Sequence, residues 1–149
     1  MQPNPLAGPK HEFTRVDGEP TWRFQPMNNA YDERLRSILK KSAYDEHIHQ
    51  GVYLAVTGPS YESEAECIAF RDGMKADTVG MSTTAEVIVA RNRGMKCVGM
   101  SCITNKIAQD GTNATNHQEV KEILDSQKVK ERLATTVRNF FATLRDNTP

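Results

Sequence analysis

The sequence predicts an α/β fold with a central, mostly parallel β-sheet flanked by helices. Apolar runs of strand length occur at 51–57, 77–81 and 95–104. Segments of helical period separate these runs, so the strands are joined by crossovers and should run parallel. Three parallel strands by themselves would leave apolar edges exposed. We therefore expect part of a larger sheet rather than a whole one.

The first 29 residues predict an irregular arm or loop. Five of the seven prolines fall within the first 26 residues, and neither a helical nor an alternating period is present there. From residue 30 the spacing of Tyr31, Leu35 and Leu39 indicates an amphipathic helix. The expected organisation is a single domain over 1–149, with an arm over 1–29 and a helix followed by β-α-β-α-β-α over 30–149.

Each later element has its own boundary signal. The run GVYLAVT ends at Gly58-Pro59, which stops a strand, and Gly94 is typical of a helix C-cap. Asn116 followed by Glu119 resembles a capping box with Asn in the Ser/Thr role, at the start of one long helix. The helices expected after the first strand cover 62–74, 84–93 and 116–144.

Composition excludes several classes of protein. Nineteen basic residues balance nineteen acidic ones, and the pI near 6.9 argues against a nucleic-acid partner. No apolar run has the length of a membrane span, so no membrane partner is expected. The three cysteines form no CxxC pair, which favours reduced thiols and a cytoplasmic location. No cluster with metal-ligand spacing predicts a metal site.

Polar side chains follow each expected strand, and the carboxyl ends of parallel strands meet at one edge of a sheet. Taken singly, they have ordinary explanations. Glu62 suits the first turn of a helix, Ser82 a helix cap and Asn105 a turn, while Tyr61 suits a core and His117 a surface. Taken together, they supply a carboxylate, an amide, an aromatic face and hydroxyls. That set suits a planar heterocycle carrying N–H donors and ring acceptors.

Long motifs carry a resemblance to a known family. GPSYESEAEC, ADTVGMSTTAEVIVARNRGMKCVGMSCITNK and the Asn116-His117 pair resemble the carboxy-terminal half of trimeric purine nucleoside phosphorylases. NPLAGP and MNNAYDERLR resemble the segment that precedes it in those enzymes. The resemblance covers about residues 3 to 145. It implies a phosphorylase-type three-layer fold and a pentosyltransferase that cleaves inosine or guanosine with phosphate, in purine salvage.

The resemblance also implies a role for each site residue. Glu62 would accept the purine N1–H, with Tyr61 beside it. Asn105, next to Thr104, would face purine N7 and O6 and stabilise the charge that builds on the departing base. Asparagine here, where relatives acting on 6-aminopurines tend to carry aspartate, favours 6-oxopurines. The remaining roles place Met81 against the ribose, Ser82 on phosphate and His117 on the ribose 5′-hydroxyl.

No cofactor or metal is implied beyond inorganic phosphate as co-substrate, and the family's assembly is a homotrimer. The sequence departs from the family in carrying Ala85 in place of a common proline and in having one extra residue between Glu62 and Met81. The amino-terminal half that supplies most of the family's phosphate site is not in this sequence, so the chain is expected to be inactive alone. The alternative is a non-catalytic purine-binding or assembly subunit that pairs with full-length protomers.

Overall fold

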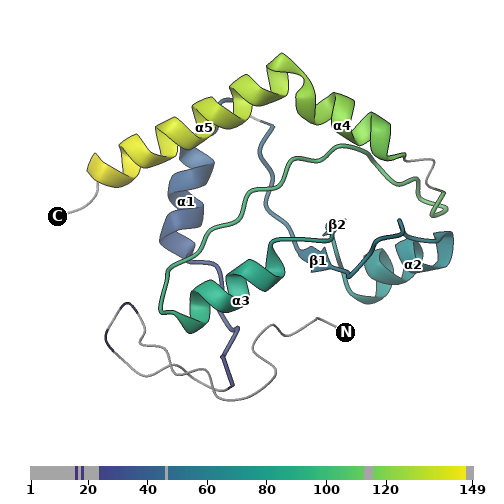
Figure 1. Cartoon of the computed structure of the whole chain (residues 1–149), viewed down its shortest axis with the longest axis horizontal. Coiled ribbons are helices and arrows are strands. Elements are labelled where there is room, and N and C mark those ends of the chain that lie inside the picture. The colour runs from purple at the N-terminus through teal and green to yellow at the C-terminus, as the bar shows by residue number, and fades with distance from the viewer. Residues whose placement is uncertain (1–15, 17, 19–23, 46, 113–115, 147–149) are drawn as a thin grey trace.

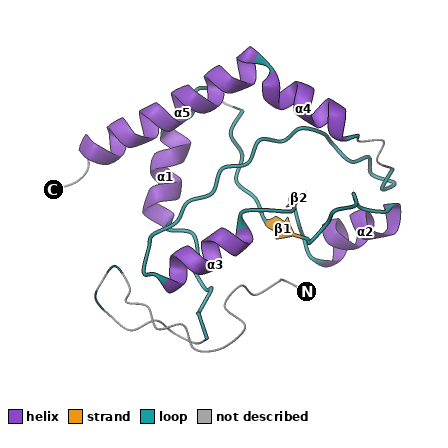
Figure 2. Cartoon of the chain, viewed as in Figure 1, coloured by secondary structure: helices purple, strands orange, loops and turns teal. Residues whose placement is uncertain are grey.

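The computed structural model describes residues 16, 18, 24–45, 47–112 and 116–146. Within these residues the fold is α/β, with helices arranged around a pair of parallel strands (Figures 1 and 2). Most of the arm expected over 1–29 lies outside the described residues. The elements are α1 (Glu33–Lys41), β1 (Tyr53–Ala55), α2 (Glu64–Ile68) continued by the π-helical turn η1 (Ala69–Gly73), β2 (Thr78–Gly80), α3 (Thr84–Asn92), α4 (His117–Asp125) and α5 (Gln127–Asp146).

The two strands lie in parallel register, as the crossover between them predicts. Tyr53 pairs with Thr78 and Ala55 pairs with Gly80. The backbone N–H of Val56 extends the ladder by donating to the carbonyl of Gly80 at 2.9 Å. Both strands therefore end at the same level, and the chain leaves them on one edge.

The strand predicted over 95–104 is wrong for the described structure. This segment is extended, but its only bridge is a single parallel one between Cys97 and Tyr31. The bridge includes a 2.8 Å hydrogen bond from the N–H of Asp32 to the carbonyl of Cys97. A run of β-branched and apolar residues becomes a strand only where another strand pairs with it, and Cys97 is the one position in this segment with such a partner among the described residues.

The helix predicted to begin at Glu62 begins two residues later. Ser63 is its N-cap: the Ser63 hydroxyl accepts from the N–H of Glu66, and the Glu66 carboxylate accepts from the N–H of Ser63 at 2.9 Å. This is a capping box. Glu62 thus precedes the helix instead of standing in its first turn, so the helix dipole does not account for its position.

The predicted single helix over 116–144 is also wrong, because it is broken at Ser126. Ser126 has extended backbone angles (φ −62°, ψ 135°) and separates α4 from α5. Its hydroxyl accepts from the N–H of Val129 at 3.3 Å and so caps α5. Asn116 caps α4 as predicted, accepting from the N–H of Glu119.

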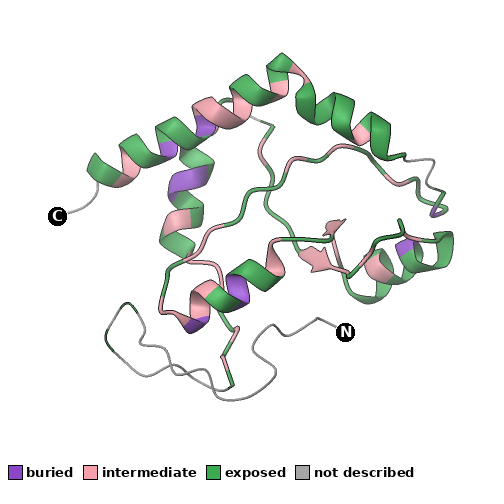
Figure 3. Ribbon diagram, viewed as in Figure 1, coloured by how far each residue is buried: buried purple, intermediate pink, exposed green. Residues whose placement is uncertain are grey.

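A small core holds α1 against α5. Ile38 and Leu39 of α1 are buried against Phe140 of α5, and Leu35 and Leu144 pack at the margin. Beside this core, an ion pair joins Arg132 to Asp45 at 2.8 Å. Most of the remaining surface is exposed or half-buried (Figure 3). The core therefore fixes α1 to α5, and other contacts position the strand-end loops.

Candidate functional site

The parallel register brings the loops after β1 and β2 together. Met81, the first residue after β2, lies with its thioether against Gly58 in the loop after β1. A side chain at Gly58 would collide with this sulfur, and the residue also has a positive φ of 63°. Gly58 therefore allows the close approach that sets Met81 beside the Ser60–Glu62 loop.

Tyr53 is a residue of this edge that sequence reasoning missed. Its hydroxyl lies over Gly80 and accepts from the backbone N–H of Ser82 at 3.4 Å. The signal was the lack of a side chain at Gly80, where any Cβ would meet the Tyr53 hydroxyl. Tyr53 thereby ties the start of the Met81-Ser82 loop to the neighbouring strand.

A strained turn follows Ser82 at the N-terminus of α3. Thr83 has φ 69° and ψ −54°, and the N–H of Thr84 donates to the carbonyl of Ser82 at 2.7 Å. These values describe a classic-type γ-turn, which is rare and costly for a β-branched residue. Strained backbone of this kind clusters at binding and catalytic sites. The Ser82 hydroxyl lies 3.4 Å from that of Thr83, so two hydroxyls stand at the entry to α3.

Two predicted site residues from distant parts of the chain meet. The Tyr61 hydroxyl lies 3.5 Å from Nδ1 of His117, the first residue of α4. Tyr61 is 39% exposed, so the pair faces solvent. An aromatic ring with a polar edge and an imidazole within reach of it suit a ligand that has both a planar ring and hydroxyl groups.

The amide of Asn105 is oriented by its neighbour. The Thr104 hydroxyl donates to Oδ1 of Asn105 at 3.0 Å. The bond engages Oδ1 as an acceptor, and the Nδ2 hydrogens of an amide are donors. Because 95–104 is not a strand, a sheet does not position Asn105.

The loop that follows Asn105 packs on α2 and η1. The guanidinium of Arg71 donates to the carbonyl of Gln109 at 2.7 Å. Gly111 is buried with φ 87°, and an added Cβ would lie 2.6 Å from the carbonyl oxygen of Glu64. The loop that begins at Asn105 therefore lies against the first turn of the helix that Glu62 precedes.

Glu62 is half-buried, and its charge reaches Cys67 on α2. Burial raises the pKa of the Cys67 thiol, and the carboxylates of Glu62 and Glu66 raise it further. A thiol kept protonated in this way is a poor nucleophile. Cys67 is thus a buried helix residue, and all three cysteines are free thiols.

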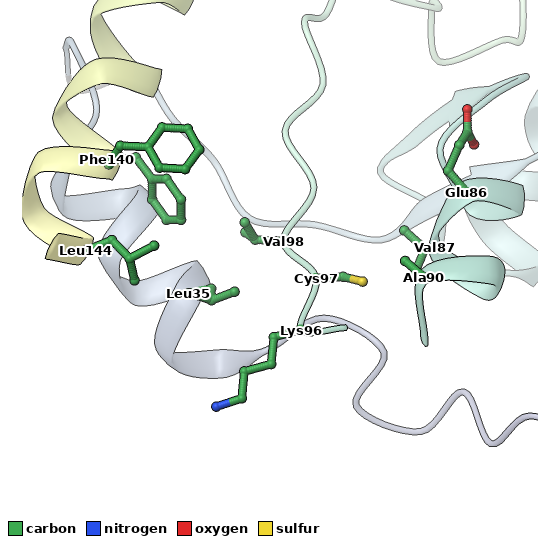
Figure 4. A pocket seen from close by; sticks show the side chains of 10 residues that line it. Leu35, Glu86, Val87, Ala90, Lys96, Cys97, Val98, Phe140 and Leu144 are labelled. Atoms are coloured by element: carbon green, nitrogen blue, oxygen red, sulfur yellow. The ribbon is translucent and has the colours of Figure 1, made fainter. Parts of the chain in front are cut away.

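Among the predicted site residues, Tyr61 and His117 meet, and Met81 lies against Gly58 in the loop that leads to Tyr61. Met81 is 43% exposed, and the candidate site is an open edge formed by the loops around Tyr61, Met81 and His117. A cavity of about 380 Å³ lies elsewhere, between α1, α3 and α5 (Figure 4). Leu35, Val87 and Phe140 line it, and Glu86 and Lys96 stand at its margin. None of the seven predicted site residues contributes to that lining.

Two kinds of feature are absent from the described part of the chain. Within it, no helix combines the length and apolarity needed to cross a membrane. No group of three or more His, Cys, Asp or Glu residues is arranged to hold a metal ion among the residues that the structure describes.

Comparison with known proteins identifies the family. The sequence profile described as the phosphorylase superfamily matches residues 3–142. Purine nucleoside phosphorylase 1 of Bacillus subtilis is 42% identical over 144 residues, which are 95% of this chain and 50% of that protein. Purine nucleoside phosphorylase of Bos taurus is 41% identical over 125 residues, covering 80% of this chain and 41% of that protein. The chain thus spans about half the length of the curated relatives it matches.

Solved structures agree with this result. The crystal structure of a schistosoma purine nucleoside phosphorylase in complex with hypoxanthine superposes with a TM-score of 0.68 and 32% identity. That superposition covers 87% of this chain and 46% of the other. The sequence match and the shared α/β architecture lead to one conclusion: the chain belongs to the phosphorylase superfamily.

Proposed function

We propose that this chain carries the purine- and ribose-recognising part of a purine nucleoside phosphorylase. The reaction is phosphate-dependent cleavage of the N-glycosidic bond of inosine or guanosine, or of their deoxy forms, in purine salvage. Its products are the purine base and ribose 1-phosphate or deoxyribose 1-phosphate. Relatives named purine nucleoside phosphorylase support this assignment, as does the similarity to a structure that holds hypoxanthine.

The observation that carries the proposal is the contact between Tyr61 and His117. These residues are 56 positions apart, yet the Tyr61 hydroxyl lies 3.5 Å from the His117 ring nitrogen. A base lying near Tyr61 and a sugar hydroxyl near His117 would be adjacent, as they are in a nucleoside. Met81, which lies against Gly58 in the loop that leads to Tyr61, would cover the ribose from the strand side.

Glu62 and Asn105 are the proposed catalytic residues. An ionised carboxylate only accepts hydrogen bonds, so Glu62 would hold the N1–H of a 6-oxopurine. Asn105, with Oδ1 engaged by Thr104, would donate from Nδ2 to the purine edge carrying N7 and O6. A phosphate oxygen bonds to C1′ while the C1′–N9 bond breaks and its electron pair passes to the purine. A donor aimed at that developing charge stabilises the transition state.

Ser82 is the proposed phosphate contact of this chain. It precedes α3, and its backbone N–H is held by the Tyr53 hydroxyl. Inorganic phosphate is the co-substrate, and the proposal requires neither a metal nor another cofactor. We further propose a cytoplasmic enzyme that assembles as a homotrimer, in which this chain forms one partial nucleoside phosphorylase domain over residues 1–149.

Phosphorolysis of inosine by the purified chain tests the catalytic part of the proposal. Hypoxanthine release is followed with phosphate and, as the control, without it. Release that requires phosphate and is lost in Asn105→Ala supports catalysis by these residues. Absence of turnover in a folded chain that still binds hypoxanthine restricts the role of the chain to recognition, which is the second candidate below.

The second candidate is a non-catalytic purine-binding or assembly subunit that pairs with full-length protomers. The apolar surface around the cavity between α1, α3 and α5 favours it. Phe141 is 60% exposed and lies beside the apolar residues that line this cavity, and contiguous exposed apolar surface is typical of interaction sites. Co-purification with a full-length protomer, lost in Phe141→Glu, would support this function.

A further inference from the structure

The loop over 105–112 begins with the proposed base-contacting amide, so contacts that hold this loop limit where Asn105 can lie. Within the loop, the N–H of Gly111 donates to the carbonyl of Ala108 at 3.0 Å. The carboxylate of Asp110 accepts from the N–H of Thr112 at 3.0 Å. These bonds shape the end of the loop but do not attach it to another element.

The attachment comes from Arg71 on η1. Its guanidinium is held by Asp72 through two bonds, Nε to Oδ1 at 2.8 Å and Nη2 to Oδ2 at 3.0 Å. This two-point geometry directs the remaining nitrogen, Nη1, to the carbonyl of Gln109 at 2.7 Å. Arginine offers planar donors in a fixed fork, and lysine cannot satisfy these three bonds from one point charge.

The Arg71–Asp72 pair keeps its charges over the neutral range. The hydrogen bond from Arg71 lowers the pKa of the Asp72 carboxyl, and the bond to Asp72 raises the pKa of the Arg71 guanidinium. Both side chains are exposed, so their attraction alone adds little stability. The geometry of the pair therefore serves to orient the third bond, to the loop.

Gly111 supplies the second anchor. It is buried against the carbonyl of Glu64 with a positive φ, so the loop lies flat on the first turn of α2. Glu62 stands two residues before that helix. Arg71 and Gly111 together hold the Asn105 loop to the element that presents the proposed N1–H acceptor.

We infer that Arg71 is a positioning residue for 6-oxopurine recognition, holding the loop of Asn105 against α2 through the backbone of Gln109. The inference rests on the proposed function. It requires that loosening the loop weakens binding of hypoxanthine, which needs the Asn105 amide at O6 and N7, more than it weakens binding of adenine.

The test compares Arg71→Gln with Arg145→Gln in the full chain. Arg145 also pairs with the aspartate that follows it, Asp146, but lies in the last turn of α5, so it is a matched control. Hydrogen exchange at Ala108, Gly111 and Thr112 reports the loop, and calorimetric titration with hypoxanthine and with adenine reports recognition. A third variant, Arg71→Lys, retains the positive charge but lacks the planar guanidinium that bonds to Asp72 at two points.

The expected result is faster exchange in the loop of Arg71→Gln and hypoxanthine binding weakened about threefold to tenfold, the size of one lost neutral hydrogen bond from the Asn105 amide. The affinity for adenine should be unchanged, and Arg145→Gln should bind both bases as the wild type does. The hypoxanthine affinity of Arg71→Lys should lie between those of the wild type and Arg71→Gln. Faster exchange with unchanged hypoxanthine affinity overturns the inference, as does an equal loss for both bases. A wild-type chain that binds neither base contradicts the proposed function instead. In that case hydrogen exchange still reports whether Arg71 holds the loop to the helix.

Discussion

The Tyr61 hydroxyl lies 3.5 Å from Nδ1 of His117, and this contact joins the loop after β1 to the first turn of α4. It brings a proposed base contact next to a proposed ribose contact. Asn116, the N-cap of α4, fixes the start of the helix and with it the place of His117. The hydroxyl of Tyr61 is therefore expected to matter for the sugar more than for the base.

Tyr61→Phe tests this expectation. The change keeps the ring and removes the hydroxyl, so the affinity for inosine should fall about threefold to tenfold, as for one lost hydrogen bond, with little change for hypoxanthine. Calorimetric titrations with both ligands measure the difference. Tyr44→Phe, at an exposed tyrosine after α1, is the control. An equal loss of affinity for hypoxanthine and for inosine would contradict the placement of the Tyr61 hydroxyl near the ribose.

Asn105→Asp should move preference toward 6-aminopurines. A carboxylate accepts the 6-amino hydrogens and repels the O6 of hypoxanthine, whereas the amide donates to O6. The ratio of adenine affinity to hypoxanthine affinity should rise at least about tenfold, because unpaired polar groups discriminate strongly. Asn28→Asp, at an exposed turn before α1, makes the same chemical change as a control. An unchanged ratio would place Asn105 away from the base.

The sequence predicts well what depends on local pattern. The helix expected at 84–93 is observed at Thr84–Asn92, and the parallel pairing of β1 with β2 follows from the crossover between them. The predicted strand over 95–104 was wrong because a strand also needs a partner, which periodicity does not supply. The single helix after Asn116 was wrong because the pattern did not show that Ser126 ends one helix and caps the next.

The site was predictable in residue type and less so in position. Ser63 and Glu66 have capping-box spacing, so the displacement of Glu62 from the helix could have been read from the sequence. The roles of Tyr53 and Arg71 could not, because each acts through a contact between distant segments. Tyr53 reaches Ser82 and Arg71 reaches Gln109. The ligand contacts proposed for these residues stay predictions.

Two neighbouring phenylalanines should differ in their effect on stability. Phe140 is 8% exposed in the core between α1 and α5, whereas Phe141 is 60% exposed, with its ring centroid 5.4 Å from that of Phe140. Phe140→Ala should lower the free energy of unfolding by about 3 kcal/mol or more. Phe141→Ala should cost about 1 kcal/mol, the value of an aromatic pair. Urea unfolding measures both, and equal costs would contradict the assigned core.

Ser63→Ala should destabilise α2 in a pH-dependent way. Removing an N-cap hydroxyl costs about 1 kcal/mol at pH 7. Hydrogen bonds from the backbone and then the hydroxyl of Ser63 lower the pKa of Glu66. A carboxyl with a lowered folded-state pKa stabilises the fold above its unfolded pKa, and this contribution is lost as the pH falls through the folded value.

The difference between wild type and Ser63→Ala should therefore shrink on acidification below the pH at which an unfolded glutamate titrates. Urea unfolding at pH 7 and at pH 3 measures this difference. Ser60→Ala, at an exposed serine in the preceding loop, is the control. A difference that stays the same at both pH values would mean that the Glu66 carboxylate does not take part in the cap.

Binding of hypoxanthine tests the central claim, that the loops after β1 and before α4 form a purine site. Hypoxanthine is titrated into the ¹⁵N-labelled chain, and amide shifts are followed in wild type, Glu62→Ala and the control Glu64→Ala. The account predicts saturable shifts at Tyr61, Glu62, Asn105 and His117, weakened at least about tenfold in Glu62→Ala, where an ionised acceptor is lost, and retained in Glu64→Ala. Shifts confined to other parts of a folded chain, or equal affinity in Glu62→Ala, would contradict it.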